Sequence, residues 1–137
     1  ALLRHVDAFL PSDMEIRSLF GDEADVGETV ARLHDWGARI VVVKLGAEGV
    51  LVSDGRSQQQ LSAFHAAGNT AVVDVTGAGD SFCGGFMVGL AQTGDPLRAA
   101  QMGLVSASLV IEGYGARYAL NRRQEAAPRL AQLGSRQ

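Results

Sequence analysis

The sequence predicts an α/β domain built on a mostly parallel sheet flanked by helices, and three observations support this class. Short apolar runs typical of strands alternate with longer amphipathic patterns typical of helices. One run, "RIVVVKLG" at 39–46, is apolar without alternation, which is typical of a parallel strand covered on both faces. A glycine-rich stretch directly follows a later apolar run, at the strand end where open α/β sheets bind ligands.

The first expected elements are a strand and a capped helix. The run "VDAFLP" at 6–11 predicts a short strand that ends at its proline. Ser12 and Glu15 then have the spacing of a capping box, in which each side chain bonds the backbone N–H of the other residue. A helix is therefore expected from Ser12 to about Gly21.

A second helix and a hairpin complete the first half. The helical pattern at 26–36 lies between the first strand and the apolar strand at 39–46, which is a βαβ order. Asp54 and Gly55 then lie between two extended runs within 49–64, and this dipeptide suits the positive backbone angles of a type I′ turn. We expect an inserted antiparallel hairpin here.

The second half is expected to hold one strand and three helices, at 70–75 and at about 80–92, 96–111 and 121–133. Asp95 and Pro96 mark the start of the second helix as its N-cap and first residue. Pro128 is expected to bend or shorten the last helix.

Three glycines lie inside the helix expected at 80–92. Gly84, Gly85 and Gly89 would each cost about 1 kcal/mol relative to alanine in a helix interior. We expect that this helix packs closely against a neighbouring strand or helix, where larger side chains would not fit.

Composition narrows the classes of partner. The length of 137 residues suits one domain or part of one, and a formal net charge of -3 without a Lys/Arg cluster disfavours nucleic acid. No apolar segment reaches the ~20 residues of a membrane span. The single cysteine, Cys83, neither pairs internally nor forms a zinc motif. We expect a cytoplasmic protein that acts on a small molecule, with no nucleic-acid or membrane partner.

The stretch "VDVTGAGDSFCGGF" at 73–86 predicts an anion site. A helix that begins near Asp80 leaves the N–H groups of Ala78, Gly79 and Asp80 without helical partners, and the helix dipole adds positive charge there. Gly77 and Gly79 would let phosphate oxygens approach the main chain without meeting a Cβ atom.

Two other phosphate-binding motifs do not fit this chain. A Walker A loop, GxxxxGK[ST], is excluded because the only lysine, Lys44, is followed by Leu45 and Gly46. The dinucleotide motif GxGxxG would need a glycine where Phe82 stands.

Asp80 adds a catalytic group to the predicted anion site. A carboxylate at such a place can accept the proton of a hydroxyl group as that hydroxyl attacks a phosphoryl group. Because the helix dipole favours the ionised carboxylate, Asp80 would be a weak base, and positioning and electrostatics would dominate the catalysis. The alternative role for Asp80 is the N-cap of the helix.

At these residues the chain resembles a known family. The segment "DVTGAGDSFCGGF" resembles the C-terminal signature of the ribokinase-like, or PfkB-type, carbohydrate kinases, whose pattern is approximately DTxGAGDxFxGG. "FLPSDMEIRSLFG" resembles the PNxxE segment of that family, and "VVVKLGAEGVLV" resembles its nucleotide-site strand and turn. The resemblance covers nearly all of residues 1–137 and implies the C-terminal, nucleotide-binding part of a ribokinase-like domain.

The opening "ALLRHVDAFLPSD" is also typical of the middle of a longer protein, because its strand comes with little of a preceding helix. A mature protein that has lost its initiator methionine is the alternative. An isolated piece of this kind is expected to be inactive by itself and to form a homodimer or associate through an exposed sheet edge.

The resemblance implies a catalytic role for the residues that match the family signature. Asp80 would be the base toward a sugar or similar alcohol, and Gly77, Ala78 and Gly79 would form the anion hole for the transferred phosphoryl group. Glu15 would organise Mg²⁺ through water.

The resemblance also implies sites for the nucleotide and a monovalent cation. The positions that match the nucleotide contacts of the family are Lys44, Gly46 and Gly49. Asp74 and the Thr76 backbone, with the loop near 111–117, match the place where many members hold K⁺. One position departs from the family: Ser12 replaces its asparagine, which shortens the side chain and removes an amide donor near the Mg²⁺ site.

The predicted function is therefore an ATP-dependent phosphotransferase acting on a hydroxyl group of a sugar, sugar derivative or nucleoside. Two alternatives stay open. One is a non-catalytic nucleotide-binding or interaction module derived from such a kinase. The other is a binder of phosphorylated ligands that has no preference for ATP.

Overall fold

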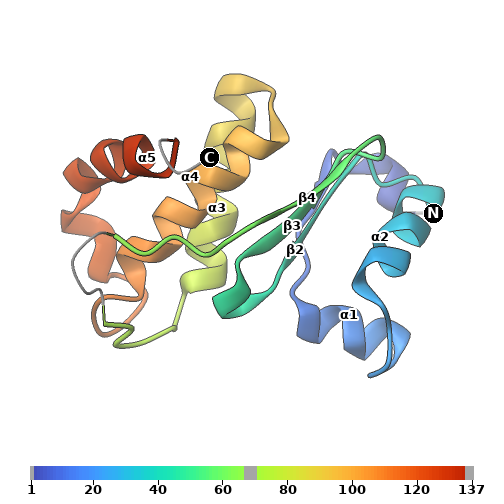
Figure 1. Cartoon of the computed structure of the whole chain (residues 1–137), viewed down its shortest axis with the longest axis horizontal. Coiled ribbons are helices and arrows are strands. Elements are labelled where there is room, and N and C mark those ends of the chain that lie inside the picture. The colour runs from blue at the N-terminus through green and yellow to red at the C-terminus, as the bar shows by residue number, and fades with distance from the viewer. Residues whose placement is uncertain (1, 67–70, 135–137) are drawn as a thin grey trace. The chain divides into compact units, whose positions relative to one another are not determined.

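The computed structural model of the chain describes residues 2–66 and 71–134. They fall into two units: the described part of Ala1–Ser62 holds a sheet and its helices, and the described part of Ala63–Gln137 holds further helices and the loops between them (Figure 1). None of the described helices is long and apolar enough to cross a membrane.

The elements follow the order that the sequence predicts, with one exception. Those of the first unit are η1 (Leu3–His5), β1 (Ala8–Phe9), α1 (Asp13–Phe20), α2 (Val26–Asp35), β2 (Ile40–Lys44), η2 (Gly46–Glu48), β3 (Val50–Ser53) and β4 (Gln58–Leu61). Those of the second unit are α3 (Ala78–Thr93), α4 (Pro96–Val110), η3 (Tyr118–Asn121), η4 (Arg123–Glu125) and α5 (Ala126–Gly134).

The sheet has the order β1-β2-β3-β4, and its strand directions correct the expected mostly parallel arrangement. Only β1 and β2 are parallel, whereas β2 with β3 and β3 with β4 are antiparallel. A parallel pair needs a crossover of a dozen or more residues, which α1 and α2 provide between β1 and β2. The short turn at 45–49 between β2 and β3 allows only an antiparallel pair.

The predicted hairpin is confirmed, but its predicted two-residue turn is wrong. The last pair of β3 and β4 is Ser53 with Gln58, so four residues connect the strands. Asp54 Oδ1 accepts hydrogen bonds from the backbone N–H groups of Arg56 and Ser57, at 2.9 and 2.8 Å. The aspartate thus stabilises a longer turn through its side chain.

Local signals predict the two helices of the first unit well. Ser12 caps α1, and both hydrogen bonds of its capping box with Glu15 are present. Asp25 caps α2 by accepting from Glu28 N. Both helices lie on one side of the sheet (Figure 1). One core cluster of this unit consists of Ile16, Val30, Leu33, Ala38, Val41 and Val43.

The strand expected at 70–75 is the exception. Thr70 lies outside the described residues, and 71–75 form no strand. The backbone N–H groups of Val73 and Asp74 both donate to Ile111 O, at 2.7 and 3.3 Å, and Val72 and Val75 are exposed. A strand needs a neighbouring strand to bond its backbone, and among the described residues these positions have none.

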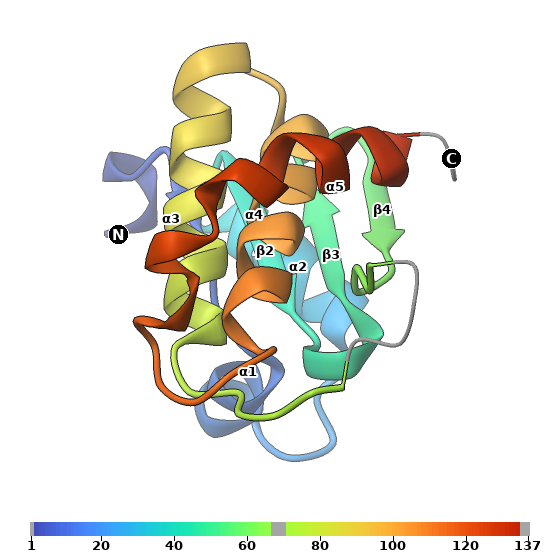
Figure 2. The ribbon, with the colours of Figure 1, turned by 90° about the vertical axis from the view of Figure 1, so that its left-hand side faces the viewer.

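Helices α3 and α4 are antiparallel neighbours joined by Gly94 and Asp95, and α5 packs on α4 (Figure 2). A Cβ atom at Gly85 would lie 2.8 Å from Met102 O, and one at Gly89 would lie 2.7 Å from Ala99 Cα. The expected close packing is therefore confirmed for these two glycines, and the neighbour is α4. It is wrong for Gly84, where a Cβ would meet nothing within 4 Å.

The last helix is shorter than expected. Helix α5 begins at Ala126, after the two 3-10 turns, so Pro128 lies in its first turn. A proline causes no kink there, because the first N–H groups of a helix have no helical partner.

Two alanine substitutions test this packing. Gly84→Ala is expected to raise the free energy of unfolding by about 0.5–1 kcal/mol, because alanine restricts the unfolded chain and favours the helix. Gly85→Ala is expected to lower it by about 1–3 kcal/mol, because its Cβ would collide with α4. Denaturant unfolding of the complete protein measures both. Effects of the same sign would contradict this arrangement of α3 and α4.

Candidate functional site

The predicted site residues fall into two groups, one in each unit. The second unit holds Asp74, Thr76, Gly77, Ala78, Gly79 and Asp80. The first unit holds Glu15, Lys44, Gly46 and Gly49.

Gly77 is the N-cap of α3 and has a left-handed backbone, with φ 81° and ψ 2°. A Cβ atom here would lie 2.5 Å from Ala116 Cβ and 3.0 Å from Ala116 Cα. Glycine is therefore required twice, by the backbone conformation and by the close approach of another segment.

The first N–H groups of α3 differ in their bonding. Ala78 N donates to Val75 O at 3.1 Å, and Ser81 N donates to Gly77 O at 2.9 Å. The N–H groups of Gly79 and Asp80 donate to none of the described residues. The expectation of three free donors is thus corrected to two, because the loop before the helix folds back onto Ala78. Two free donors at the N-terminus of a long helix still favour an anion.

Asp80 is the third residue of α3, and its side chain is exposed. The N-cap is Gly77, three residues earlier, and no side chain of the described residues caps this helix. The alternative role of Asp80 as N-cap is therefore wrong. Its carboxylate stands in the first turn of the helix together with the two free N–H groups.

Asp74 joins the loop before α3 to the loop after α4. Its Oδ1 accepts from Thr76 N and its Oδ2 accepts from Gly115 N, both at 2.9 Å. The hydrogen bonds from Thr76, and then the one from Gly115, hold the pKa of Asp74 below its ordinary value. Asp74 is therefore an ionised carboxylate in a fixed orientation, and two residues later the Thr76 carbonyl accepts no hydrogen bond from the described residues. These oxygens fit a monovalent cation.

Glu15 is exposed and is held by the capping box of α1. Its Oε2 accepts from Ser12 N at 2.6 Å and from Ser12 Oγ at 2.9 Å. The hydrogen bonds from the Ser12 backbone and side chain, together with the charge of Lys44, keep the pKa of Glu15 below its ordinary value. The other oxygen, Oε1, accepts no hydrogen bond from the described residues, so Glu15 fits a water bound to Mg²⁺. Ser12 thus orients the glutamate although it lacks the amide of the family's asparagine.

The residues predicted to contact the nucleotide lie where β2 turns into β3. Lys44 ends β2 and forms a parallel bridge with Ser12. Gly46 and Gly49 have φ values of 59° and 98°, and Leu45 N bonds Gly49 O across the turn at 2.8 Å. Both glycines are therefore explained by the turn, and the space around Gly46 is open, since a Cβ there would meet nothing within 4 Å.

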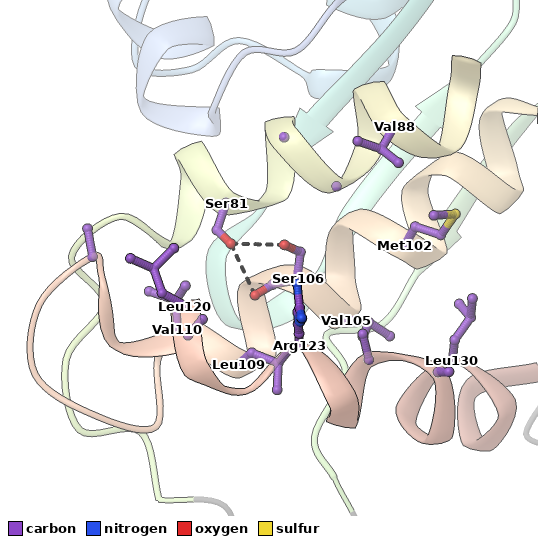
Figure 3. Close-up of a pocket in the computed structure, with 16 residues that line it drawn as sticks. Ser81, Val88, Met102, Val105, Ser106, Leu109, Val110, Leu120, Arg123 and Leu130 are labelled. Atoms are coloured by element: carbon purple, nitrogen blue, oxygen red, sulfur yellow. Dashed lines mark hydrogen bonds between the residues drawn. The ribbon is translucent and has the colours of Figure 1, made fainter. Parts of the chain in front are cut away.

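An apolar pocket of about 730 Å³ lies in the second unit between α3, α4 and the segment 116–130 (Figure 3). Ser81 Oγ lies 3.1 Å from Ser106 O and 3.0 Å from Ser106 Oγ at its wall, so this polar group already has partners. Most of the lining is apolar, including Val88, Met102 and Leu109. None of the predicted site residues lines this pocket.

Sequence reasoning missed a buried ionic cluster at the end of the chain. Arg129 donates to both carboxylate oxygens of Glu112, at 2.6 and 2.9 Å, and to Glu125 at 2.8 Å. Arg122 pairs with the same two glutamates. Burial raises the pKa of Glu112, but the hydrogen bonds and charges of Arg129 and Arg122 outweigh it and lower the pKa overall. The sequence hinted at this cluster only through helical pair spacings, three residues from Arg122 to Glu125 and four from Glu125 to Arg129.

Residues 1–123 of the chain match the family model "pfkB family carbohydrate kinase". Among curated proteins, an uncharacterized sugar kinase of Archaeoglobus fulgidus is 36% identical over 121 residues. The match covers 88% of this chain and 46% of that protein. The chain thus spans less than half the length of this relative.

Solved structures share the fold. A ribokinase of Arabidopsis thaliana, complexed with ribose and ATP, has a TM-score of 0.82 and 30% identity, over 94% of this chain and 42% of that one. A double-mutant fructokinase of Vibrio cholerae, with fructose, ADP and a potassium ion bound, has a TM-score of 0.78 and 29% identity, over 93% and 41%. These matches confirm a ribokinase-like α/β fold, present as a partial domain. The chain belongs to the pfkB family of carbohydrate kinases.

Proposed function

We propose that residues 1–137 are the C-terminal, nucleotide-binding part of an ATP-dependent kinase that phosphorylates a hydroxyl group of a sugar, sugar derivative or nucleoside. One observation carries this proposal. Asp80 is an exposed carboxylate in the first turn of a 16-residue helix, beside the unpaired N–H groups of Gly79 and Asp80 itself. A base and an anion site thus share one helix end.

The reaction is a transfer of the γ-phosphoryl group of ATP. Asp80 takes the proton of the acceptor hydroxyl while the hydroxyl oxygen bonds the phosphorus and the bond to the ADP oxygen breaks. The loop Gly77–Ala78–Gly79 surrounds the transferred group, and the free N–H groups stabilise the negative charge on its oxygens. Gly77 lets the loop adopt this conformation, since its φ is 81°.

The remaining residues hold the nucleotide and the cations. Lys44, Gly46 and Gly49 contact ATP, with the lysine supplying the positive charge. Glu15 would hold Mg²⁺ through water, and the ion would supply positive charge to the phosphate oxygens. Asp74 and the Thr76 carbonyl would hold K⁺. The ATP in the Arabidopsis ribokinase and the potassium ion in the Vibrio fructokinase support the choice of ATP and K⁺ as ligands.

A coupled assay of ADP release by the complete protein tests this function. We expect turnover with ATP and Mg²⁺ for at least one acceptor in a panel of pentoses, hexoses and nucleosides. ATP binding without turnover on any acceptor would favour the non-catalytic nucleotide-binding module. Inorganic phosphate that binds as tightly as ATP would favour a binder of phosphorylated ligands.

The 137 residues by themselves are expected to associate into homodimers or larger species without activity. The sheet ends in two edge strands, β1 and β4, and Gln58, Gln59 and Gln60 of β4 are exposed. An edge strand offers unpaired backbone groups to a second copy. Sedimentation velocity measures this, and a monodisperse monomer at tens of micromolar would contradict it.

A further inference from the structure

Within the cluster of Glu112, Arg122, Glu125 and Arg129, the central pair is buried to an unusual degree for charged groups. The side chains of Arg129 and Glu112 are only 6% and 9% exposed. Arg129 Nη1 also donates to Ser108 Oγ at 3.0 Å, so α5 is bonded to α4 itself as well as to Glu112, two residues after the end of α4. Burying such charges carries a large desolvation cost, and apolar replacements are often as stable. Stability alone therefore gives a poor account of the cluster.

The position of Glu112 in the chain suggests another role. The residue before it, Ile111, accepts the N–H groups of Val73 and Asp74 with its carbonyl oxygen. Three residues after it, Gly115 donates to Asp74 Oδ2 at 2.9 Å. The next residue, Ala116, is the one that a Cβ atom at Gly77 would touch.

The segment 111–116 therefore has two attachments. Arg122 and Arg129 hold it through the carboxylate of Glu112. Its own backbone holds Asp74 and lies against Gly77. Only two residues separate Glu112 from Gly115, and three separate it from Ala116. A movement of Glu112 would therefore change the orientation of the Asp74 carboxylate and the packing at the N-cap of α3.

We propose that Glu112 and Arg129 are positioning residues for the proposed cation and anion sites. Arg129 fixes Glu112, Glu112 fixes the segment 111–116, and this segment fixes Asp74 and Gly77. Helix α5 thus controls the geometry of the loop Gly77–Ala78–Gly79 from outside the proposed ligand sites. The expected effect on catalysis rests on the proposed kinase function. The coupling of Glu112 to Asp74 and Gly77 can be measured without any substrate.

Three variants of the complete protein test the proposal. Arg129→Met removes the guanidinium group and keeps an apolar side chain of similar length. Glu112→Gln removes the charge with almost no change of shape and serves where Arg129→Met fails to fold. Arg123→Met is the matched control, because Arg123 is exposed and forms no ion pair with the described residues.

The first readout is amide hydrogen exchange without ligand. In Arg129→Met and Glu112→Gln, the amides of Thr76 and Gly115, which donate to Asp74, are expected to exchange about tenfold faster, as after the loss of one charge-assisted hydrogen bond. Amides in the middle of α3 and those of Arg123→Met are expected to exchange as in the wild type. Exchange that is unchanged at Thr76 and Gly115, or raised equally throughout the unit, would overturn the proposal.

The second readout is kinetic. The K⁺ concentration for half-maximal activity is expected to rise at least about fivefold in both variants, the size of a modest coupling energy, with a KM for ATP that changes less than about twofold. Faster exchange at Thr76 and Gly115 in a protein without kinase activity would support the structural coupling and reject the proposed function. Kinase activity with unchanged K⁺ dependence would reject the positioning role.

Discussion

Asp80→Asn is expected to lower the kcat of the complete protein by about 10²–10⁴-fold and to leave its affinity for ATP near the wild-type value. Asparagine has almost the shape of aspartate but cannot accept the proton of the acceptor hydroxyl. The N–H groups of Gly79 and Asp80 remain in place, because the backbone of α3 does not depend on this side chain. Steady-state kinetics and calorimetric titration with ATP measure the two quantities.

Asp95→Asn is the control for the change of charge. Asp95 caps α4 by accepting from Leu97 N and Arg98 N, and asparagine caps helices equally well. We expect near wild-type kcat for this variant. A turnover of Asp80→Asn like that of the wild type would remove Asp80 as the base, and a joint loss of kcat and ATP affinity would indicate a structural role.

Gly77→Ala is expected to affect both stability and catalysis. Alanine at a φ of 81° costs about 1–2 kcal/mol, and its Cβ would lie 2.5 Å from Ala116 Cβ, which adds the cost of overpacking. The free energy of unfolding should fall by about 2 kcal/mol or more. The kcat should fall by about 10²-fold or more, since the loop that presents the N–H donors must move.

Gly94→Ala separates backbone strain from collision. Gly94 ends the same helix with a φ of 67°, and a Cβ atom there would meet nothing within 4 Å. The free energy of unfolding of this variant should fall only by the backbone strain of about 1–2 kcal/mol, and its kcat should not change. Equal losses of stability in Gly77→Ala and Gly94→Ala, measured by thermal unfolding, would show that contact with Ala116 does not matter.

The helices of this protein could be predicted because their signals are local. The hydrogen bonds of the capping box in α1 join Ser12 to Glu15, three residues apart, and the N-caps of α2 and α4 act within three residues as well. Such bonds form wherever the backbone turns into a helix, whatever packs against it. Helix α3 has no side-chain cap among the described residues, but its start was predicted to within two residues, because the glycine loop before it and the helical pattern after it are also local signals.

The sheet was predicted less well because strand pairing is a relation between distant segments. Residues 71–75 have the apolar pattern of a strand, but among the described residues their backbone N–H groups donate only to the carbonyl oxygen of Ile111. The directions of β2 and β3 follow from the length of the turn between them rather than from their apolar content. A pattern of apolar residues does not contain either piece of information.

By itself, the sequence determined the helices with their caps, the glycine loop with its carboxylate, and the family to which the chain belongs. Only the tertiary structure decided which groups meet across the chain. The bond between Gly115 and Asp74 joins residues 41 positions apart, and Ala116 explains why Gly77 has no side chain. The pairing of Arg129 with Glu112 likewise depends on how α5 packs on α4. Helix signals act over a few neighbouring residues, whereas these contacts exist only after the chain has folded.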